Sequence, residues 1–199
     1  MSTINPGRTD PRVRRTRKAI ETAFFALVNE QGFSQVTVQD ISERAEINRA
    51  TFYIHYRDKD DLFQSLISES FDALISQQLK SASTLTPENL RGLLEIVFGY
   101  LTKIYADCEA HDDNMQAQLE VQIRNKVEVI LQSWLRKLRQ SADAPMMEAD
   151  HVASMLAWMI FGSALRWHQM QNPPPLEQML RQTLHFMQGG LRHCGYGMV

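Results

Sequence analysis

The strongest constraint on the fold of this chain is a pair of helix-start signals eleven residues apart, Thr37 and Asn48. Thr37 is a favourable N-cap, and Asp40 three residues later completes a variant of the capping box. The apolar residues that follow have helical spacing: Val38, Ile41 and Ala45. The interval leaves room for one helix of about two turns and a tight turn before a second helix starts behind Asn48.

The second helix, predicted over residues 49–56, has polar and aromatic side chains on its outward side. Phe52 and Tyr56 are expected to be core residues that hold it against the first helix of the chain, predicted over residues 11–31. Two helices joined by so short a turn, with Arg, Thr, Tyr and His facing outward on the second, are typical of a DNA-reading helix-turn-helix.

The residues of this stretch follow the pattern T-V-x-D-I-x-x-x-A-x-I-N-x-x-T-F-Y-x-H-Y-x-x-K-x-x-L. The pattern resembles the N-terminal DNA-binding domain of the TetR family of bacterial transcriptional regulators, and the resemblance covers about residues 12–65. The family usually has glycine in the turn, where this chain has Glu46. Glycine adopts positive φ without strain, whereas glutamate does so only at some cost. The resemblance therefore implies the fold of the family with a somewhat altered turn.

An all-α fold is expected throughout. The resemblance implies a three-helix DNA-binding domain over residues 11–58, followed by a helical effector-binding and dimerisation domain over residues 59–199. In the second domain, apolar spacing, Pro87 and the corner at residues 172–175 predict five helices. They should cover about residues 60–80, 87–105, 115–140, 147–171 and 176–189.

Side chains near the start of a recognition helix reach base edges in the major groove, so Arg49 is predicted to read a guanine. With Gln39 added from the resemblance, the predicted base-reading residues are Gln39, Arg49, Ala50 and Tyr53. Phosphate contacts are predicted for Arg14, Arg15, Thr37, Thr51, His55 and Lys59. Lys59 is included because it lies beside a helix N-terminus, which favours anions. For the arginines of the first helix, a solvated basic face is the alternative.

The charge distribution favours a polyanionic partner met at one end of the chain. Residues 8–18 contain six Arg or Lys and one acid, whereas residues 64–199 contain 11 basic and 14 acidic residues. A basic tip on an acidic body predicts double-stranded operator DNA as the partner. A sequence-independent architectural DNA binder is the alternative, but it would need a more extensive basic surface than a pI near 6.3 allows.

A homodimer is expected because operators are usually read by two-fold dimers. The last two helices are the predicted interface, since their apolar stripes exceed what one partner helix would cover, and the resemblance implies a four-helix bundle built from them. The predicted interface residues are Met155, Met159, Gly162, Ser163, Met179, Thr183, Phe186 and Met187. The alternative is that both helices only close the core of one subunit.

The resemblance also implies a pocket for a small-molecule effector among the middle helices. Large or adaptable side chains that suit such a cavity are Tyr100, Tyr105, Met115, Trp134, Trp158, Phe161 and Trp167. Ordinary core packing is the alternative for each of them. No charged cluster in this region identifies the effector.

Several other classes of protein are disfavoured. The chain has no H-E-x-x-H, G-x-S-x-G, Gly-rich phosphate loop or Cys-x-x-Cys, so no catalytic residue, cofactor or metal is predicted and a small helical enzyme is a remote alternative. Cys108 and His111 resemble metal ligands in composition only, and a structural loop is expected there. Cys108 and Cys194 do not form a disulfide framework. No apolar run approaches the roughly 18 residues of a membrane span, and the polar N-terminus predicts a cytoplasmic protein.

Taken together, these patterns predict a homodimeric transcriptional repressor that a small-molecule effector releases from its operator. A ligand-dependent activator of the same fold is the alternative. The operator, the regulated genes and the effector do not follow from the sequence.

Overall fold

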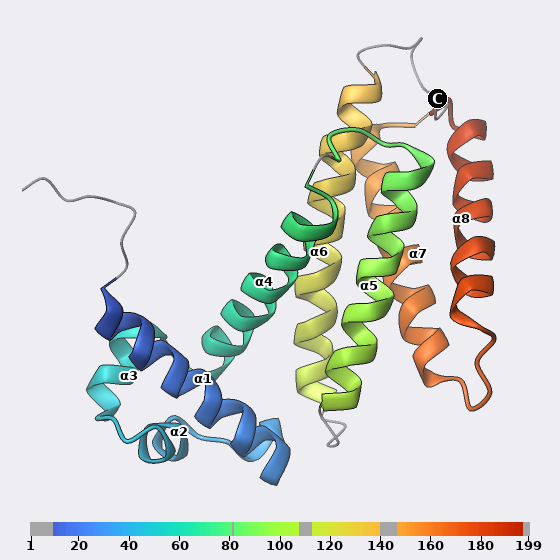
Figure 1. Cartoon of the computed structure of the whole chain (residues 1–199). Coiled ribbons are helices and arrows are strands. Elements are labelled where there is room, and N and C mark those ends of the chain that lie inside the picture. The colour runs from blue at the N-terminus through green and yellow to red at the C-terminus, as the bar shows by residue number, and fades with distance from the viewer. Residues whose placement is uncertain (1–9, 81, 108–112, 140–146, 197–199) are drawn as a thin grey trace, which may run out of the picture. The chain divides into compact units, whose positions relative to one another are not determined.

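A computed structural model describes residues 10–80, 82–107, 113–139 and 147–196 (Figure 1). These residues form eight α-helices and one short 3₁₀ helix, with no β-strand among them, which confirms the all-α prediction. The elements are α1 Pro11–Gln31, η1 Phe33–Gln35, α2 Val38–Arg44, α3 Arg49–His55, α4 Lys59–Gln78, α5 Pro87–Asp107, α6 Asp113–Arg139, α7 Ala149–Gln169 and α8 Leu176–His193.

The described residues divide into two compact units. The N-terminal unit runs to Leu66 and includes the start of α6 as far as Ala117. The other unit, called the body below, contains the second part of α4, α5, the rest of α6, α7 and α8. The division falls inside α4, between Leu66 and Ile67.

Helix α1 of the N-terminal unit has a well-defined start and end. Asp10 accepts a hydrogen bond from the Arg12 amide at 2.8 Å, and Pro11 occupies the first turn, where its missing N–H costs nothing. The helix ends at Gly32, whose φ of 82° favours glycine and whose amide donates to the Val28 carbonyl at 2.9 Å. The predicted span of the first helix is therefore confirmed.

An aromatic cluster joins α1, η1 and the first turns of α4. Phe24 and Phe33 lie edge to face with ring centroids 6.1 Å apart, and Phe63 packs on them at 6.2 Å and 5.2 Å. All three rings are buried. Aromatic pairs at these separations contribute beyond the burial of their area. The cluster explains why the first turns of α4 belong to the N-terminal unit.

Helix α3 is fastened to α1 by the two residues predicted from the sequence. Phe52 and Tyr56 are both buried, which confirms their assignment to the core. The Tyr56 hydroxyl accepts a hydrogen bond from Arg17 Nε at 3.1 Å, and the Arg17 guanidinium lies 5.5 Å from the centroid of the same ring. Burial and this polar contact together set which side of α3 faces outward.

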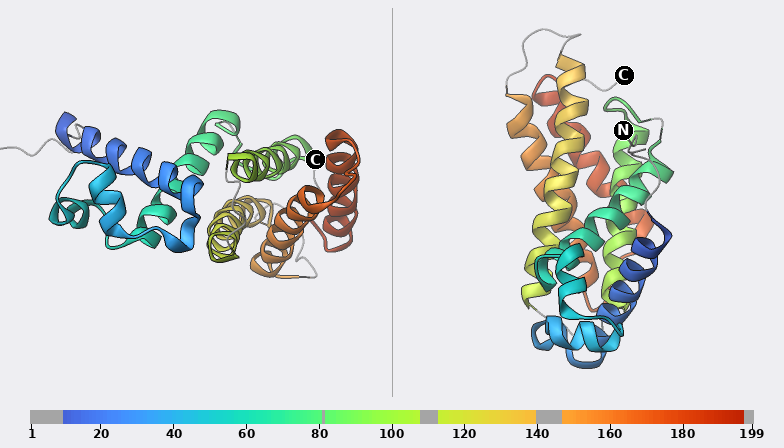
Figure 2. Two further views of the ribbon diagram at one scale, coloured as in Figure 1. Left: turned by 90° about the horizontal axis from the view of Figure 1, so that it is seen from below. Right: turned by 90° about the vertical axis from the view of Figure 1, so that its left-hand side faces the viewer.

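In the body, α5 to α8 run alongside one another, and consecutive helices alternate in direction (Figures 1 and 2). Their apolar stripes face inward, as the helical spacing predicted; on α5 the buried residues include Leu90, Leu93, Leu94, Val97, Phe98 and Leu101. Gly92 allows α5 to approach the end of α4 closely, because a Cβ there would lie 2.9 Å from Leu79 Cδ2.

The second part of α4 is held to α5 by a polar contact in an apolar setting. The hydroxyls of Ser70 and Tyr100 are 2.6 Å apart, and the Tyr100 hydroxyl also donates to the Ile67 carbonyl at 3.3 Å. The Phe71 ring packs edge-on against Tyr100 at 5.3 Å. Burial raises the pKa of Tyr100 to about 12, although the bond with Ser70 opposes the shift.

The end of α8 differs from the prediction. The helix was expected to stop at Gly189 but continues through Gly190 to His193. The stop is instead at Gly195, which has φ 86°, with Gly195 N donating to Arg192 O at 3.2 Å and Tyr196 N donating to Leu191 O at 2.9 Å. This is a Schellman motif. The buried Tyr196, whose hydroxyl donates to the Met147 carbonyl at 2.8 Å, explains why the chain turns back there.

Candidate nucleic-acid interface

The start of α2 carries the predicted capping box. Thr37 Oγ1 accepts a hydrogen bond from the Asp40 amide at 3.2 Å, and the Thr37 amide donates to Asp40 Oδ2 at 2.9 Å. The hydroxyl of Thr37 also donates to Asp40 Oδ2 at 2.7 Å, and these bonds lower the pKa of the Asp40 carboxyl. Asn48 caps α3 in turn, with its Oδ1 accepting from the Ala50 amide at 2.8 Å. Both helix starts are therefore set by local side chains.

The turn between α2 and α3 is a Schellman motif with a glutamate in the position that favours glycine. Glu46 has φ 54°, the only positive φ of a non-glycine residue in the described part of the chain. Its amide donates to Glu43 O at 3.1 Å, and the Ile47 amide donates to Ser42 O at 3.0 Å. Both bonds of the motif form despite the side chain. The departure from the family's glycine thus adds local strain without opening the turn.

The outward side of α3 presents Arg49, Ala50, Tyr53 and Ile54, all of them exposed. Three of the four predicted base-reading residues are therefore adjacent on one helix face. Arg49 Nη2 lies 3.4 Å from the Tyr53 hydroxyl, which is a long hydrogen bond. Because that contact is weak, it leaves the donors of the guanidinium available for the base edge that the sequence predicts Arg49 to read. The fourth residue, Gln39, is exposed on α2 and donates to Glu43 Oε1 at 2.9 Å.

The predicted phosphate contacts surround this face unevenly. Arg14 and Arg15 are exposed on α1, whereas Thr51 and His55 are half-buried on α3. Burial lowers the pKa of His55, and the positive charge of Arg17 lowers it further. His55 is therefore a neutral imidazole near pH 7 and offers a hydrogen bond rather than a charge.

Lys59 is anchored within the N-terminal unit. Its ammonium donates to the Phe33 carbonyl at 2.9 Å and to the Ser34 carbonyl at 3.1 Å, and it lies 4.8 Å from the centroid of the Phe33 ring. An ammonium has three donors, and two of them are used here. Lys59 therefore fastens the start of α4 to η1. A phosphate contact from Lys59 remains a prediction, which this anchoring makes less favourable.

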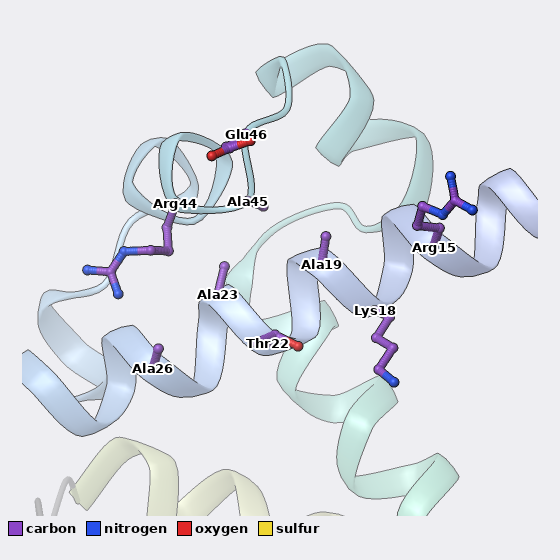
Figure 3. Close-up of a pocket in the computed structure, with 9 residues that line it drawn as sticks. All are labelled: Arg15, Lys18, Ala19, Thr22, Ala23, Ala26, Arg44, Ala45 and Glu46. Carbon is purple, nitrogen blue, oxygen red and sulfur yellow. The ribbon is translucent and has the colours of Figure 1, made fainter.

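A hollow of about 420 Å³ lies between α1 and α2 (Figure 3). Ala19 and Ala23 of α1 point across it toward α2, and small side chains at these positions account for the space. Arg44, at its rim, is held away by a two-pronged ion pair with Glu30 at 2.7 and 2.8 Å. None of the residues predicted to contact an effector lines this hollow.

The predicted effector residues occupy different surroundings. Tyr100, Trp134 and Phe161 are buried within the body, whereas Met115 is buried within the N-terminal unit. The ring of Tyr105 stacks on His168 with ring centroids 4.5 Å apart. Burial raises the pKa of the Tyr105 hydroxyl, and the negative charge of Glu120 raises it further.

Two tryptophans of this set have contacts of other kinds. Trp167 donates through Nε1 to the Pro174 carbonyl at 2.8 Å, and its ring packs near Phe98 at 5.9 Å. Trp158 is 51% exposed, so its placement in a pocket is not supported. Its ring instead lies 4.3 Å from the Arg124 guanidinium on the surface of the subunit. The reason is that α7 turns Trp158 to the opposite side from its buried residues.

The predicted dimer residues also separate into two groups. Met155, Gly162 and Phe186 are exposed, and Met159, Ser163 and Met179 are half-buried. Thr183 and Met187 are buried inside the subunit, because α8 turns them inward with Leu180 and Leu191. These two residues therefore do not belong to a free interface. Trp158, which the sequence placed in the effector pocket, lies three residues after Met155 and shares with it the exposed apolar face of α7.

The loop expected around Cys108 and His111 lies outside the described residues. Among the residues that are described, no three or more His, Cys, Asp or Glu side chains are grouped so as to hold a metal ion. In the same part of the chain, no helix combines the length and apolarity needed to cross a membrane.

Sequence reasoning missed one feature of α3. Ile54 is exposed beside Ala50 and Tyr53, although an isoleucine at this position was not assigned a role. The available signal was the pairing of Ile54 with Ala50 at i, i+4, on the side away from Phe52.

Comparisons with known proteins agree with this geometry. The family model described as bacterial regulatory proteins, tetR family, matches residues 22–66. The HTH-type transcriptional regulator YxbF of Bacillus subtilis is 42% identical over 67 residues, a match that spans 33% of this chain and only 18% of YxbF. The HTH-type transcriptional repressor KstR2 of Mycolicibacterium smegmatis is 24% identical over 177 residues, 81% of this chain and 83% of KstR2.

The fold as a whole is also found in solved structures. Thermus thermophilus FadR, a TetR-family transcriptional repressor in complex with lauroyl-CoA, superposes with a TM-score of 0.61 at 22% identity, over 88% of this chain and 94% of FadR. A capped helix-turn-helix at residues 37–56, the family match across it and the common all-helical fold agree. Residues 22–66 therefore match the DNA-binding domain of the TetR family of bacterial regulatory proteins, and the chain as a whole shares its fold with solved TetR-family regulators.

Proposed function

We propose that this protein is a homodimeric, sequence-specific DNA-binding transcriptional regulator that represses its target genes and leaves its operator when a small-molecule effector binds. The observation that carries the proposal is the outward face of α3, held by caps and a closed turn and bearing an arginine with uncommitted donors. Side chains in this arrangement enter the major groove in helix-turn-helix proteins.

Specificity is assigned to Arg49, with Ala50, Tyr53 and Gln39 as further base contacts. A two-pronged contact to guanine discriminates against other bases by about 1–3 kcal/mol, whereas a phosphate contact does not discriminate. Arg14, Arg15, Thr37, Thr51 and His55 are proposed to hold the phosphates on either side of the groove. Lys59 is the least favoured of this group because its ammonium is bonded to Phe33 O and Ser34 O.

The proposal of a homodimer rests on the exposed apolar face of α7 and α8. Phe186 is 69% exposed and Trp158 is 51% exposed, and Met155 is also exposed. Large apolar side chains gathered on one face mark interaction surfaces. Gly162 on the same face has open space around it, which lets a second helix approach. Sedimentation at micromolar concentration should give twice the monomer mass of 22.9 kDa.

The effector is proposed to bind in the body. FadR of Thermus thermophilus was crystallised with lauroyl-CoA, so lauroyl-CoA is the first ligand to test here, with free coenzyme A as the control. A ligand that prefers a conformation with the wrong separation of recognition helices weakens DNA binding, and DNA weakens ligand binding by the same factor. The expected coupling is about 1–3 kcal/mol, or roughly 5- to 150-fold.

The decisive experiment is selection of DNA fragments by the purified full-length protein, followed by titration of the selected and a random fragment at several salt concentrations. We expect a palindromic site bound at least about 10³-fold more tightly than random DNA. Equal affinity for both fragments would refute sequence-specific reading. A reporter gene placed behind the selected site then separates a repressor from an activator.

The role of Arg49 is tested on the same fragments. Arg49→Ala is expected to lose about 1–3 kcal/mol at one base pair and to relax the preference there. Arg192→Ala, which removes an exposed arginine of α8, is the matched control and should bind as the wild type does. If Arg49→Ala weakens every sequence equally, Arg49 is a phosphate contact.

A further inference from the structure

The recognition helix carries an apolar side chain that its position in the fold does not require. Ile54 is 79% exposed, the largest exposed fraction of any large hydrophobic side chain in the described part of the chain. Phe52 and Tyr56, two residues to either side, are buried. Ile54 therefore makes little contribution to the core of the N-terminal unit, and its apolar surface is left in water.

The neighbours of Ile54 indicate which partner would cover this surface. Ala50, one helical turn earlier, is exposed on the same side of α3, and Tyr53 beside it is half exposed. Arg49 lies at one end of this apolar strip, and Arg57 follows at the other end, where its exposed guanidinium pairs with Asp61 at 2.9 Å. The positive charge of Arg49 beside a narrow apolar strip fits a polyanion with a local apolar group, rather than an apolar protein surface.

The major groove of DNA offers one apolar group, the C5-methyl of thymine. Isoleucine is β-branched, and in a helix it is held close to one χ1 rotamer, so it presents its methyl groups with little loss of conformational freedom. Alanine is the other aliphatic side chain on this face and also fits a thymine methyl.

We propose that Ile54, together with Ala50, reads thymine methyl groups, so that each operator half-site has thymine at one or two positions facing the side of α3 that bears these two residues. This inference rests on the proposed DNA-binding function. It assigns the apolar part of the specificity to the methyl contacts of Ala50 and Ile54, and the hydrogen-bonded part to Arg49 at the start of the recognition helix.

The test replaces each thymine of the selected operator by uracil, one position at a time. Uracil keeps the hydrogen-bonding groups of thymine and lacks only the methyl group. Covering one methyl contributes about 0.8 kcal/mol, which corresponds to roughly a fourfold change in affinity. The wild-type protein is therefore expected to lose about fourfold at one or two thymines of each half-site and little elsewhere.

The variant Ile54→Ala completes a double-mutant cycle on the same DNA. It should bind the thymine operator several-fold more weakly than the wild type and should lose the sensitivity to uracil at a position that Ile54 reads. Because Ile54 is exposed, the Ile54→Ala variant should have the stability of the wild type, and its DNA binding should have the same salt dependence. Val129→Ala is the matched control, since Val129 is also an exposed β-branched residue, on α6 in the body, and its variant should keep the full uracil sensitivity.

The outcomes separate the two proposals. If the wild type selects no operator, the proposed function fails. If it binds an operator but no thymine-to-uracil change weakens binding, or if Ile54→Ala keeps the wild-type sensitivity, the methyl contact is refuted while the DNA-binding function stands. A uniform loss for Ile54→Ala on thymine and uracil operators would place Ile54 against the sugar-phosphate backbone and would also refute the inference.

Discussion

The N-terminal unit and the body are both helical, but their helices are specified in different ways. In the N-terminal unit, α2 and α3 have seven residues each, and both begin at a side chain that caps the helix, Thr37 and Asn48. In the body, α7 and α8 have 21 and 18 residues, and neither begins with a side-chain cap hydrogen bond. Helices shorter than about 12–15 residues are marginal without such help, whereas longer amphipathic helices are stabilised by packing.

The contacts that hold the body together join residues that are far apart in the sequence. Lys126 of α6 pairs with Asp72 of α4 at 2.6 Å, and Ser70 bonds with Tyr100 across 30 residues. In the helix-turn-helix, by contrast, the caps and the turn use partners within five residues. Local devices therefore shape the proposed reading surface, and burial holds the body. Five predictions concern these two units.

The largest effect is expected from Phe71→Ala in the body. Phe71 is fully buried against Tyr100, so its removal should lower the free energy of unfolding by about 3–5 kcal/mol. Urea denaturation followed by tryptophan fluorescence measures this. Phe25→Ala, which removes a half-exposed ring on α1, should cost less than about 1 kcal/mol. Similar losses for both variants would contradict the assignment of stability to burial in the body.

Phe71→Ala also tests whether α4, inside which the chain first passes from the N-terminal unit to the body, transmits the proposed effector signal. In this variant, the factor by which ligand weakens operator binding should fall well below the wild-type factor. Operator affinity without ligand should change less. A variant that folds and dimerises with the full ligand response would remove this part of α4 from the signalling route.

Removing a local cap should have a smaller effect, confined to the N-terminal unit. Thr37→Ala deletes the capping box of α2 and is expected to cost about 1 kcal/mol of stability. Glu148→Ala at the start of α7 should change stability by less than about 0.5 kcal/mol, because no side chain caps that helix. Thermal denaturation of the two variants checks the comparison. Equal losses would show that α7 depends on its first residue as much as α2 does.

Tyr100→Phe should cost about 1 kcal/mol below pH 9, because it removes the hydroxyl that bonds Ser70 and Ile67 O. The folded-state pKa of Tyr100 is raised to about 12, above the ordinary value of about 10. Between these values the unfolded chain has lost the proton that the folded chain still holds, so this contribution to stability falls as pH rises from about 10 to 12. The wild type should therefore lose its advantage over the variant across that window. If the difference in free energy of unfolding between the wild type and Tyr100→Phe stayed constant from pH 9 to 11, the Tyr100 hydroxyl would not be buried in the folded state.

The smallest effect is expected at the helix-turn-helix turn. Glu46→Gly relieves the strain of φ 54° but increases the freedom of the unfolded chain, so we expect a gain of only a few tenths of a kcal/mol. Gly195→Ala, at the equivalent position of the Schellman motif after α8, introduces the same strain and should lose about 1 kcal/mol. Differential scanning calorimetry should show a higher melting temperature for Glu46→Gly and a lower one for Gly195→Ala. A loss of stability for Glu46→Gly would mean that the Glu46 side chain stabilises the turn.

Much of the fold was predictable because its signals are local. The caps at Thr37 and Asn48 predicted where two helices start, and both side chains accept the expected backbone hydrogen bonds. The outward positions of Arg49 and Tyr53 followed from the period of the helix once Phe52 was assigned to the core. Each cap depends on a residue at most three positions away, so the sequence by itself contains both partners of each capping hydrogen bond.

The tertiary structure decided where side chains point when the partner is distant. Lys59 turns inward because carbonyl groups 25 and 26 residues earlier lie within reach of its ammonium. Thr183 and Met187 face the subunit core and Trp158 faces outward because the packing of α7 and α8 sets the rotation of each helix. Helix α8 extends past Gly189 because the Tyr196 hydroxyl donates a hydrogen bond to the carbonyl of Met147, 49 residues earlier in the chain. Helical periodicity defines which residues share a face, but only the packing of the whole chain determines which face is buried.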